Sequence, residues 1–527
     1  MKPNRLLLYV SLFVLLCVSS GMARQQTEQL GQVHFAVSCS TAAQPQFDRA
    51  VALLHSFWYS EAVKAFIAVT ETDPGCAMGY WGIAMSHWYP LWQPPSEAML
   101  KKGRDAVTQA QATGGKTERE QAYIAAIAAF YRDWEKRDHQ TRALAYEKAM
   151  ERLVARYPDD REAAIFYALA LNATALTTDK TYANQLKATA ILEKIFAEEP
   201  NHPGVAHYLI HSYDYPALAT RGLPAARRYA QIAPSSSHAL HMPSHVFTRL
   251  GLWQESIATN RDSAAAAKAH NSVFEQLHAL DYLAYAYLQG AQDVAAQSVL
   301  DERNALAQAD LSNFAAAYAF AAIPARYTLE RRRWSEAAAL EPYPSKVTYS
   351  EAITYFARAL GAARSGNAES ARANVDKLQS LATTLRDAKQ TYWAEQVEIQ
   401  HRVAEAWLLY AEGKPEEALT LMRAAVALED ATEKHPVTPG PIMPARELLG
   451  ELLLELHDPA HALQAFEISI QKEPNRFNGL YGAARAAELA GERDKAKSYY
   501  DKVVALCEHS DTARPELQQA KAFLAKQ

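Results

Sequence analysis

Several features common in catalytic and membrane proteins are scarce in this sequence of 527 residues. It has only 4 cysteines and 20 glycines, and it contains no glycine-rich phosphate loop, no nucleophile elbow and no Cys-x-x-Cys motif. Its formal net charge is −5 and it has no basic tract that would follow phosphates, so nucleic acid is not an expected partner. The longest apolar run covers residues 6–18, which is shorter than the roughly 20 residues needed to cross a bilayer. These absences exclude the common motif-based enzyme classes and a membrane-spanning helix.

The first 23 residues have the pattern of a cleavable secretory signal peptide. Lys2 and Arg5 precede the apolar run, and small residues occupy both cleavage-determining places of Gly21-Met22-Ala23. Removal of residues 1–23 would take the net charge from −5 to −7, because the segment contains no acid. We therefore expect a periplasmic or secreted protein with no membrane span after cleavage.

Three cysteines remain beyond the predicted signal peptide. Export to an oxidising compartment permits a disulfide, and Cys39 with Cys76 is the pair that we expect. That pairing leaves Cys507 free near the C-terminus. Three thiols so far apart are a weak case for a thiolate metal site.

The rest of the chain has the composition of an almost entirely helical protein. Alanine and leucine abound and strand-like alternation is nearly absent, with one short strand expected at residues 33–37. Thr117 and Glu120 form a capping-box pattern that predicts a helix start. Residues 435–441, with three prolines and a glycine, predict an irregular linker.

A 34-residue period recurs along the chain, as in tetratricopeptide repeats. The C-terminal copy has Gly450, Ala462, Phe466 and Pro474 at the consensus places where helices cross, where an aromatic ring fills the seam, and where the second helix ends. Further matches in the same frame are Ala484, Ala496 and Tyr500; Ala62, Phe66 and Pro74; Ala188, Leu192 and Pro200; Ala359, Ala371 and Val375; and Ala406, Ala418 and Met422. The pattern predicts an all-α fold, a right-handed superhelical solenoid of tetratricopeptide-type helical hairpins.

The period and its interruptions suggest a division of the chain. The expected segments are a signal peptide (1–23), an N-terminal extended segment (24–45), N-terminal repeat hairpins (46–110), a central array (111–304), irregular helical repeats with the proline-rich linker (305–440), and a C-terminal pair of repeats (441–527).

Histidines are concentrated in the central array, between His207 and His278. His207 and His211 take the fifth and ninth places of one repeat, and His241 and His245 take the same places 34 residues later. These places of a first helix face the concave groove of such a solenoid, and a His-x-x-x-His pair puts two imidazoles on one helical face. Because neighbouring helices lie about 8 to 10 Å apart, the pairs are predicted to converge.

Additional residues fall at compatible groove-facing places. They are His238, His278, Asp281 and, at the twelfth place of the first of these repeats, Asp214. Pro243 lies where this helix should be regular, and it predicts a late start or a kink that would swing His238 and His241 toward His245.

The predicted site is a divalent transition-metal centre of His207, His211, His238, His241, His245, His278 and Asp281, with Asp214 at its edge. Six imidazoles in two groups of three suit a pair of copper ions, whereas three histidines plus a carboxylate such as Asp281 or Asp214 suit zinc. The acids would alternatively orient the imidazoles without touching metal. The sequence leaves these choices open, and polar groove residues are also compatible with peptide binding.

Other groove-facing positions have different chemistry. Met78, Trp81, Met85 and Trp88 predict a soft aromatic groove wall for a substrate or peptide, with packing on other helices as the alternative. Glu447, Glu451 and Arg485 are expected to be solvated charges. His55 and His87 are weaker metal candidates.

Over nearly all of its length beyond residue 23, the chain resembles the tetratricopeptide repeat superfamily. A narrower set of segments looks like a group found together in exported bacterial repeat proteins: residues 37–39, 53–57, 73–78, 202–211 and 238–245. The superfamily mainly provides scaffolds for protein and peptide partners, which implies a small molecule or peptide in the groove and an envelope protein as a further partner. Two functions are therefore expected. One is an exported copper- or zinc-dependent protein, with an enzyme as one form of it. The other is a non-enzymatic scaffold of the cell envelope.

Overall fold

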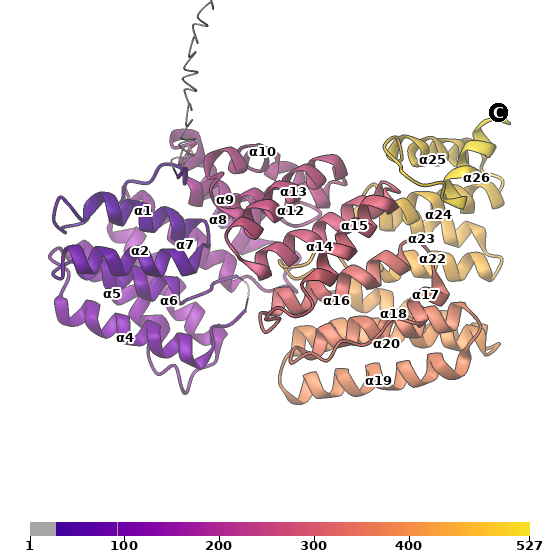
Figure 1. Ribbon diagram of the computed structural model, residues 1–527, viewed down its shortest axis with the longest axis horizontal. Helices are drawn as coiled ribbons and strands as arrows, with labels where there is room; N and C mark the ends of the chain where they lie inside the picture. The colour runs from indigo at the N-terminus through magenta and orange to yellow at the C-terminus, as the bar shows by residue number, and fades with distance from the viewer. Residues whose placement is uncertain (1–27, 92, 527) are drawn as a thin grey trace, which may run out of the picture.

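The computed structural model describes residues 28–91 and 93–526, and within them the protein is built of α-helices joined by loops (Figure 1). The first helices are α1 (Gln44–His55), α2 (Tyr59–Thr72), α3 (Ala77–Ser86), α4 (Glu97–Thr113), α5 (Glu118–Tyr131), α6 (His139–Arg156), α7 (Arg161–Thr174) and α8 (Ala183–Glu198). The central helices are α9 (Pro203–Tyr213), the 3-10 turn η1 (Ala219–Gly222), α10 (Leu223–Ile232), α11 (Ser237–His241), α12 (Pro243–Arg249), α13 (Trp253–Ala269), α14 (Val273–Gln289) and α15 (Asp293–Ala305). The remaining helices are α16 (Phe314–Leu329), α17 (Trp334–Ala338), α18 (Thr348–Arg364), α19 (Ala368–Asp387), α20 (Thr391–Ala411), α21 (Pro415–Asp430), α22 (Ala445–Glu455), α23 (Pro459–Lys472), α24 (Phe477–Leu489), α25 (Arg493–Leu506) and α26 (Pro515–Leu524).

The helices stack in the manner of a tetratricopeptide-like solenoid. Almost every helix packs against the next one in the chain, and α14, α16, α18, α20 and α22 also pack against the next but one. These contacts place every second helix in one continuous layer. In a solenoid of repeats, the first helices of successive hairpins form such a layer. The predicted all-α solenoid of helical hairpins is confirmed.

Small residues allow the close helix approach that the repeat pattern predicted. A Cβ added to Gly450 would lie 2.7 Å from the Phe466 ring, and one added to Gly482 would lie 2.3 Å from the same ring. One aromatic side chain thus fills the seam between consecutive hairpins. The capping box at Thr117 and Glu120 is also confirmed, at the start of α5.

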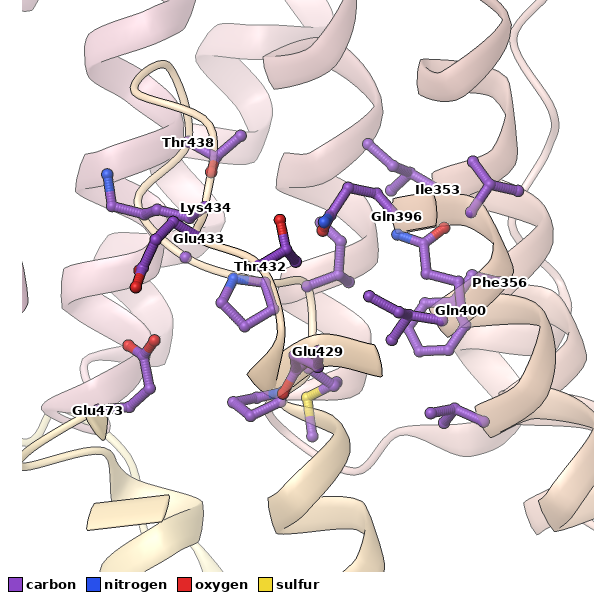
Figure 2. Close-up of a pocket in the computed structure, with 18 of the residues that line it drawn as sticks. Ile353, Phe356, Gln396, Gln400, Glu429, Thr432, Glu433, Lys434, Thr438 and Glu473 are labelled. Carbon is purple, nitrogen blue, oxygen red and sulfur yellow. The ribbon is translucent and has the colours of Figure 1, made fainter. Parts of the chain in front are cut away.

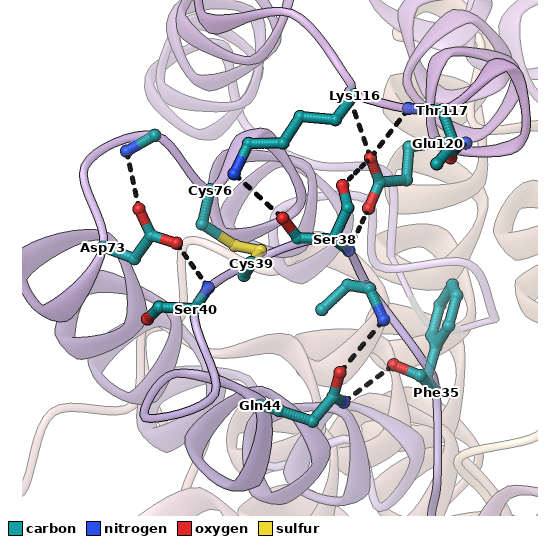
Figure 3. Close-up of a disulfide and its surroundings, with 12 residues drawn as sticks. Phe35, Ser38, Cys39, Ser40, Gln44, Asp73, Cys76, Lys116, Thr117 and Glu120 are labelled. Atoms are coloured by element: carbon teal, nitrogen blue, oxygen red, sulfur yellow. Dashed lines mark hydrogen bonds between the residues drawn. A yellow bond between two sulfur atoms is a disulfide. The ribbon is translucent and has the colours of Figure 1, made fainter.

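The extended segment before α1 is tied down by side chains and a disulfide (Figure 3). Cys39 and Cys76 form the expected disulfide, and Cys507 is free and buried. The strand expected at residues 33–37 is wrong, because no strand occurs in the residues described. Gln44 accepts a hydrogen bond from the backbone N–H of Val37 and donates one to the carbonyl of Phe35, so α1 satisfies this backbone without a β-partner.

The solenoid closes on itself, so that its inner face is covered. The indole of Trp253 in α13 donates to the carbonyl of Asn475, just before α24, and Arg514 before α26 pairs with Asp293 of α15. In Figure 1, α14 and α15 lie beside α24 at the junction between the two halves. The groove positions of the central repeats therefore face a packed interior.

The irregular linker predicted around residues 435–441 lies between α21 and α22 and is part of that interior. Arg326 of α16 donates to the carbonyls of Gly440 and Pro441, and Tyr282 of α14 donates to the carbonyl of Thr438. We call residues 431–444 the cover segment. Among the helices described, none is long and apolar enough for a membrane crossing. The predicted signal peptide lies outside the described residues.

Candidate metal centre

Six buried histidines from α9, α11, α12 and α14 meet in the packed interior of the closed solenoid. They form two sets of three, His207, His211 and His238, and His241, His245 and His278. Within each set one ligand nitrogen from each ring lies within 4.8 Å of the others. The sets are the six histidines predicted from the repeat register.

Three of these histidines lie on either side of an interruption at Met242. α11 ends at His241 and α12 begins at Pro243, so the predicted interruption at the proline is confirmed, although Met242 keeps helical dihedral angles. Pro243 has no N–H to continue a helix, and its ring fixes the first turn of α12. The predicted swing of His238 toward His245 is wrong, because His238 joins His207 and His211, whereas His241 and His245 belong to the second set.

The first set converges on Nε2 of His207. This atom lies 3.1 Å from Nε2 of His211 and 3.1 Å from Nε2 of His238. The Nδ1–H of His207 donates to the carbonyl of His55 at 2.6 Å, so the lone pair is on Nε2. This hydrogen bond fixes the tautomer that a metal ligand needs.

A glycine makes this approach between α1 and α9 possible. A Cβ added to Gly204 would lie 2.4 Å from Nδ1 of His55. Any larger residue would push α9 away from His55, whose carbonyl orients His207. Phe57 closes the first set from outside, with its ring stacked on those of His211 and His238.

The second set has the same arrangement with different supporting groups. Nε2 of His241 and Nε2 of His245 are 3.1 Å apart. Asn260 donates its amide N–H to the carbonyl of Ser256, so its oxygen faces His241 and accepts from Nδ1–H at 2.7 Å. His245 donates from Nδ1 to the carboxylate of Asp214 at 2.9 Å. Both rings therefore present Nε2 lone pairs to each other.

These distances match the spacing of ligands around one ion. A tetrahedral ion with metal–nitrogen bonds of about 2.0–2.1 Å separates its ligand nitrogens by roughly 3.3 Å. The two sets are also neighbours, since the ring centroids of His211 and His245 are 5.8 Å apart and those of His238 and His241 are 6.2 Å apart. The arrangement can hold two ions side by side.

The buried environment keeps the imidazoles neutral. Burial lowers the pKa of His207 to about 3, and burial followed by repulsion between the rings lowers the pKa of His211, His238, His241 and His278 well below the usual value. Burial also lowers the pKa of His245, although Asp214 opposes that shift. Neutral imidazole is the protonation state that binds metal.

Asp214 supports the site from behind. Its carboxylate accepts hydrogen bonds from Arg249 at 2.9 Å and Lys434 at 2.7 Å as well as from His245. Burial alone would raise its pKa, but Lys434, Arg249 and His245 bring it far below the ordinary value. Asp214 is thus an ionised group that orients His245, one of the two roles predicted for it.

Asp281 does not join the predicted ligands. Its carboxylate accepts a hydrogen bond from Arg326 at 3.0 Å, and it lies in neither histidine set. The prediction that Asp281 is a metal ligand is therefore wrong, because its carboxylate is paired with the buried guanidinium of Arg326. Through Arg326, Asp281 instead holds the cover segment.

A third group, His55, Glu162 and His202, has ligand atoms within the same separation. Nδ1 of His202 accepts the backbone N–H of Val205, so its Nε2 carries a proton and donates to Glu162 at 2.9 Å. His55 also contacts Glu162 at 2.9 Å. This group is a hydrogen-bonded support of the first set.

The predicted aromatic groove wall is part of the hydrophobic core. Met78, Trp81, Met85 and Trp88 are each about 1% exposed, which leaves no surface for a substrate or peptide. Trp81 packs edge-on against Phe35, from the N-terminal extended segment. The packing alternative is the correct one for these four residues.

The C-terminal charges were also predicted wrongly. Glu447 and Glu451 are buried, and they pair with Arg476 and Arg332 respectively. Arg485 is half-buried and pairs with Glu488. Closure of the solenoid removes Glu447 and Glu451 from solvent, whereas the Arg485 side chain is still 33% exposed.

Several supporting residues could not be found from the repeat pattern. Asn260 is on α13, a second helix of its hairpin, and Lys434 comes from a loop 220 residues away from its partner Asp214. Tyr282 packs edge-on against His241. Of these supporting residues, only Tyr282 could have been predicted from the sequence, because it lies one helical turn after His278.

Of the comparisons with known proteins, the one with solved structures gives matches at low identity. No family model and no curated protein matches the chain. Among solved structures, human IFIT1 bound to m7Gppp-AAAA aligns with a TM-score of 0.41 and 12% identity over 82% of this chain and 90% of its own. Yeast Tom70 aligns with a TM-score of 0.36 and 11% identity over 92% and 96%. The chain is a tetratricopeptide-like all-α solenoid with a buried histidine centre.

Proposed function

We propose that the protein binds two transition-metal ions, one on each histidine set, and that copper is the metal that the site prefers. The observation that carries the proposal is the convergence of three neutral imidazole nitrogens twice over, in neighbouring positions. Nothing in a repeat scaffold requires six imidazoles in one buried place, because burial of polar groups costs free energy.

The donor set favours copper over the zinc alternative. Neither histidine set contains a carboxylate, since Asp281 is paired with Arg326 and Asp214 with Arg249 and Lys434. Imidazole binds both copper and zinc, and zinc also occurs on three histidines with a water. The preference for copper rests on two carboxylate-free sets side by side, where two copper ions would exchange two electrons with one bound molecule.

Export is part of the same proposal. Disulfides persist in oxidising compartments, and the Cys39–Cys76 disulfide is consistent with a periplasmic or secreted protein. Copper is also a reasonable metal in such a compartment. The peptide-scaffold alternative loses support at the histidines, because closure of the solenoid buries them.

Metal content of the untagged protein tests the proposal. Copper or zinc is loaded, excess metal is removed by desalting, and metal per chain is measured by mass spectrometry. We expect about two equivalents of copper, about one in His207→Ala and in His241→Ala, and almost none in the double variant. His461→Ala removes an exposed histidine and is the matched control, with unchanged content.

Two results would contradict the proposal. One is less than about 0.2 equivalents of any transition metal in the folded wild-type protein. The other is metal that binds the wild type and the double variant equally, which would place it on surface groups. Preferential retention of zinc would support the metal centre and overturn the choice of copper.

A further inference from the structure

A second site lies behind the cover segment, where a small cavity of about 70 Å³ adjoins α18, α20 and α21. Arg249, Lys434 and Thr438 line it, and the first two of these also contact Asp214, so the cavity is close to the histidine centre without including any of its ligands. A cavity of this size has room for roughly five to seven water-sized groups.

Buried acceptors line this cavity without partners of their own. Oε2 of Glu433, Oγ1 of Thr432 and Oε1 of Gln400 have no hydrogen-bond partner among the residues described, and all three side chains border the space. The first two residues are 6% and 5% exposed. Because unpaired buried oxygens are costly, these atoms call for a molecule that donates hydrogen bonds.

The charges around the cavity favour a cation. Four cations line the cavity and are already paired, Arg249 and Lys434 with Asp214, and Arg446 and Lys472 with Asp430. The acids Glu429, Glu433 and Glu473 remain on the lining, and of these Glu433 has only one oxygen engaged, by Lys180 and Tyr182. Burial raises the pKa of Glu429 to about 7, an effect that a bound cation would oppose.

The opposite wall mixes apolar side chains with glutamine amides. Figure 2 shows Glu433 and Glu473 on one side of the cavity, Ile353 and Phe356 with Gln396 and Gln400 on the other, and Thr432 between them. Ile442 and Met443 add further apolar surface. A ligand here meets carboxylates at one end, and hydrocarbon beside glutamine amides at the other.

We infer that this cavity binds a small primary ammonium compound with a short apolar chain. The ammonium group donates to Glu433 and Thr432, and the chain packs on Ile353 and Phe356 beside Gln400. The inference is independent of metal binding at the histidines, so the two are tested separately.

Calorimetric titration of the full-length, chelator-treated protein with n-butylammonium chloride tests the inference. For a ligand of this size we expect a Kd of about 0.1–1 mM. Butyrate and neutral n-butanol have the same chain and should bind at least about tenfold more weakly, because they lack the cation. Metal-free protein is used so that the amine has no metal to coordinate.

Variants of the two acceptor residues locate the binding. Glu433→Gln keeps the shape, removes the charge and should weaken binding at least about tenfold, while Glu416→Gln on the exposed face of α21 should leave it unchanged. Thr432→Val in the cover segment removes the second acceptor and should weaken binding a few-fold, and it decides the matter if Glu433→Gln fails to fold. A Kd above about 10 mM, equal affinity for butyrate or n-butanol, or no effect of either cavity variant would overturn the inference and assign the cavity to water.

Discussion

Two buried polar clusters occupy equivalent repeat positions in the two halves of the molecule, and they are satisfied in different ways. His207 and His211 take the fifth and ninth places of a central repeat, as Glu447 and Glu451 do in a C-terminal one. In the C-terminal cluster each carboxylate meets an arginine. In the histidine cluster neutral nitrogens face one another at 3.1 Å.

The difference distinguishes a structural cluster from a binding cluster. Arg476 donates to Glu447 and Glu330, and Arg332 and Arg364 both donate to Glu451, so three arginines face three carboxylates within the chain. In the histidine sets, lone pairs of neutral rings face each other, as for His207 with His211 and His241 with His245, and a cation from outside would bind between them. Burial alone therefore does not indicate function; the chemistry that the buried atoms present to one another does.

The largest effect on folding stability is expected in the C-terminal cluster. Arg476→Met leaves Glu330 and Glu447 buried without their cation, which should cost about 3–5 kcal/mol in the free energy of unfolding. Metal content should not change, because the histidine sets are untouched. Chemical denaturation and metal analysis measure the two quantities.

Arg485→Met provides the control, because Arg485 is half-buried in its pair with Glu488 and its removal should cost about 1 kcal/mol or less. A loss of metal in Arg476→Met, with the fold retained, would contradict the separation of the two clusters.

An intermediate effect is expected for Asp214→Asn. The amide keeps the shape but weakens the orientation of His245, and loss of such a supporting group typically lowers metal affinity 10- to 100-fold. Only the ion on the second set should be affected. Competition with a chelator measures both affinities.

Asp458→Asn is the matched control, because it makes the same exchange beside the exposed His461. It should leave the affinity for both metal ions unchanged. An equal loss of both ions in Asp214→Asn would instead indicate general unfolding around Arg249 and Lys434.

The smallest effect is expected for Asn260→Ala. Asn260 is a neutral acceptor for His241, and loss of one such hydrogen bond costs about 1 kcal/mol, or roughly fivefold in affinity for the second ion. The same chelator competition measures it. A larger loss of affinity than in Asp214→Asn would contradict the prediction that Asp214 contributes more than Asn260 to binding of the second ion.

Much of the fold and the histidine sets could be predicted from local sequence periodicity. The spacing of His207 and His241 by one repeat puts them on neighbouring first helices, and Pro243 marks the interruption between α11 and α12. These relations depend on helix geometry and repeat length alone.

The errors arose where distant parts of the chain meet. Asp281 was predicted to be a ligand because its register is right, but Arg326 reaches it from α16. Glu447 and Glu451 were predicted to be solvated because a repeat pattern does not show that the solenoid closes. Closure depends on contacts such as that of Trp253 with Asn475, which no local period encodes.

Anomalous diffraction from crystals of the copper-loaded protein tests the central claim most directly. The account predicts two peaks, one about 2.0 Å from the Nε2 atoms of His207, His211 and His238, and one bound by His241, His245 and His278. No peak among these six rings at full copper loading, or copper on exposed histidines alone, would contradict it.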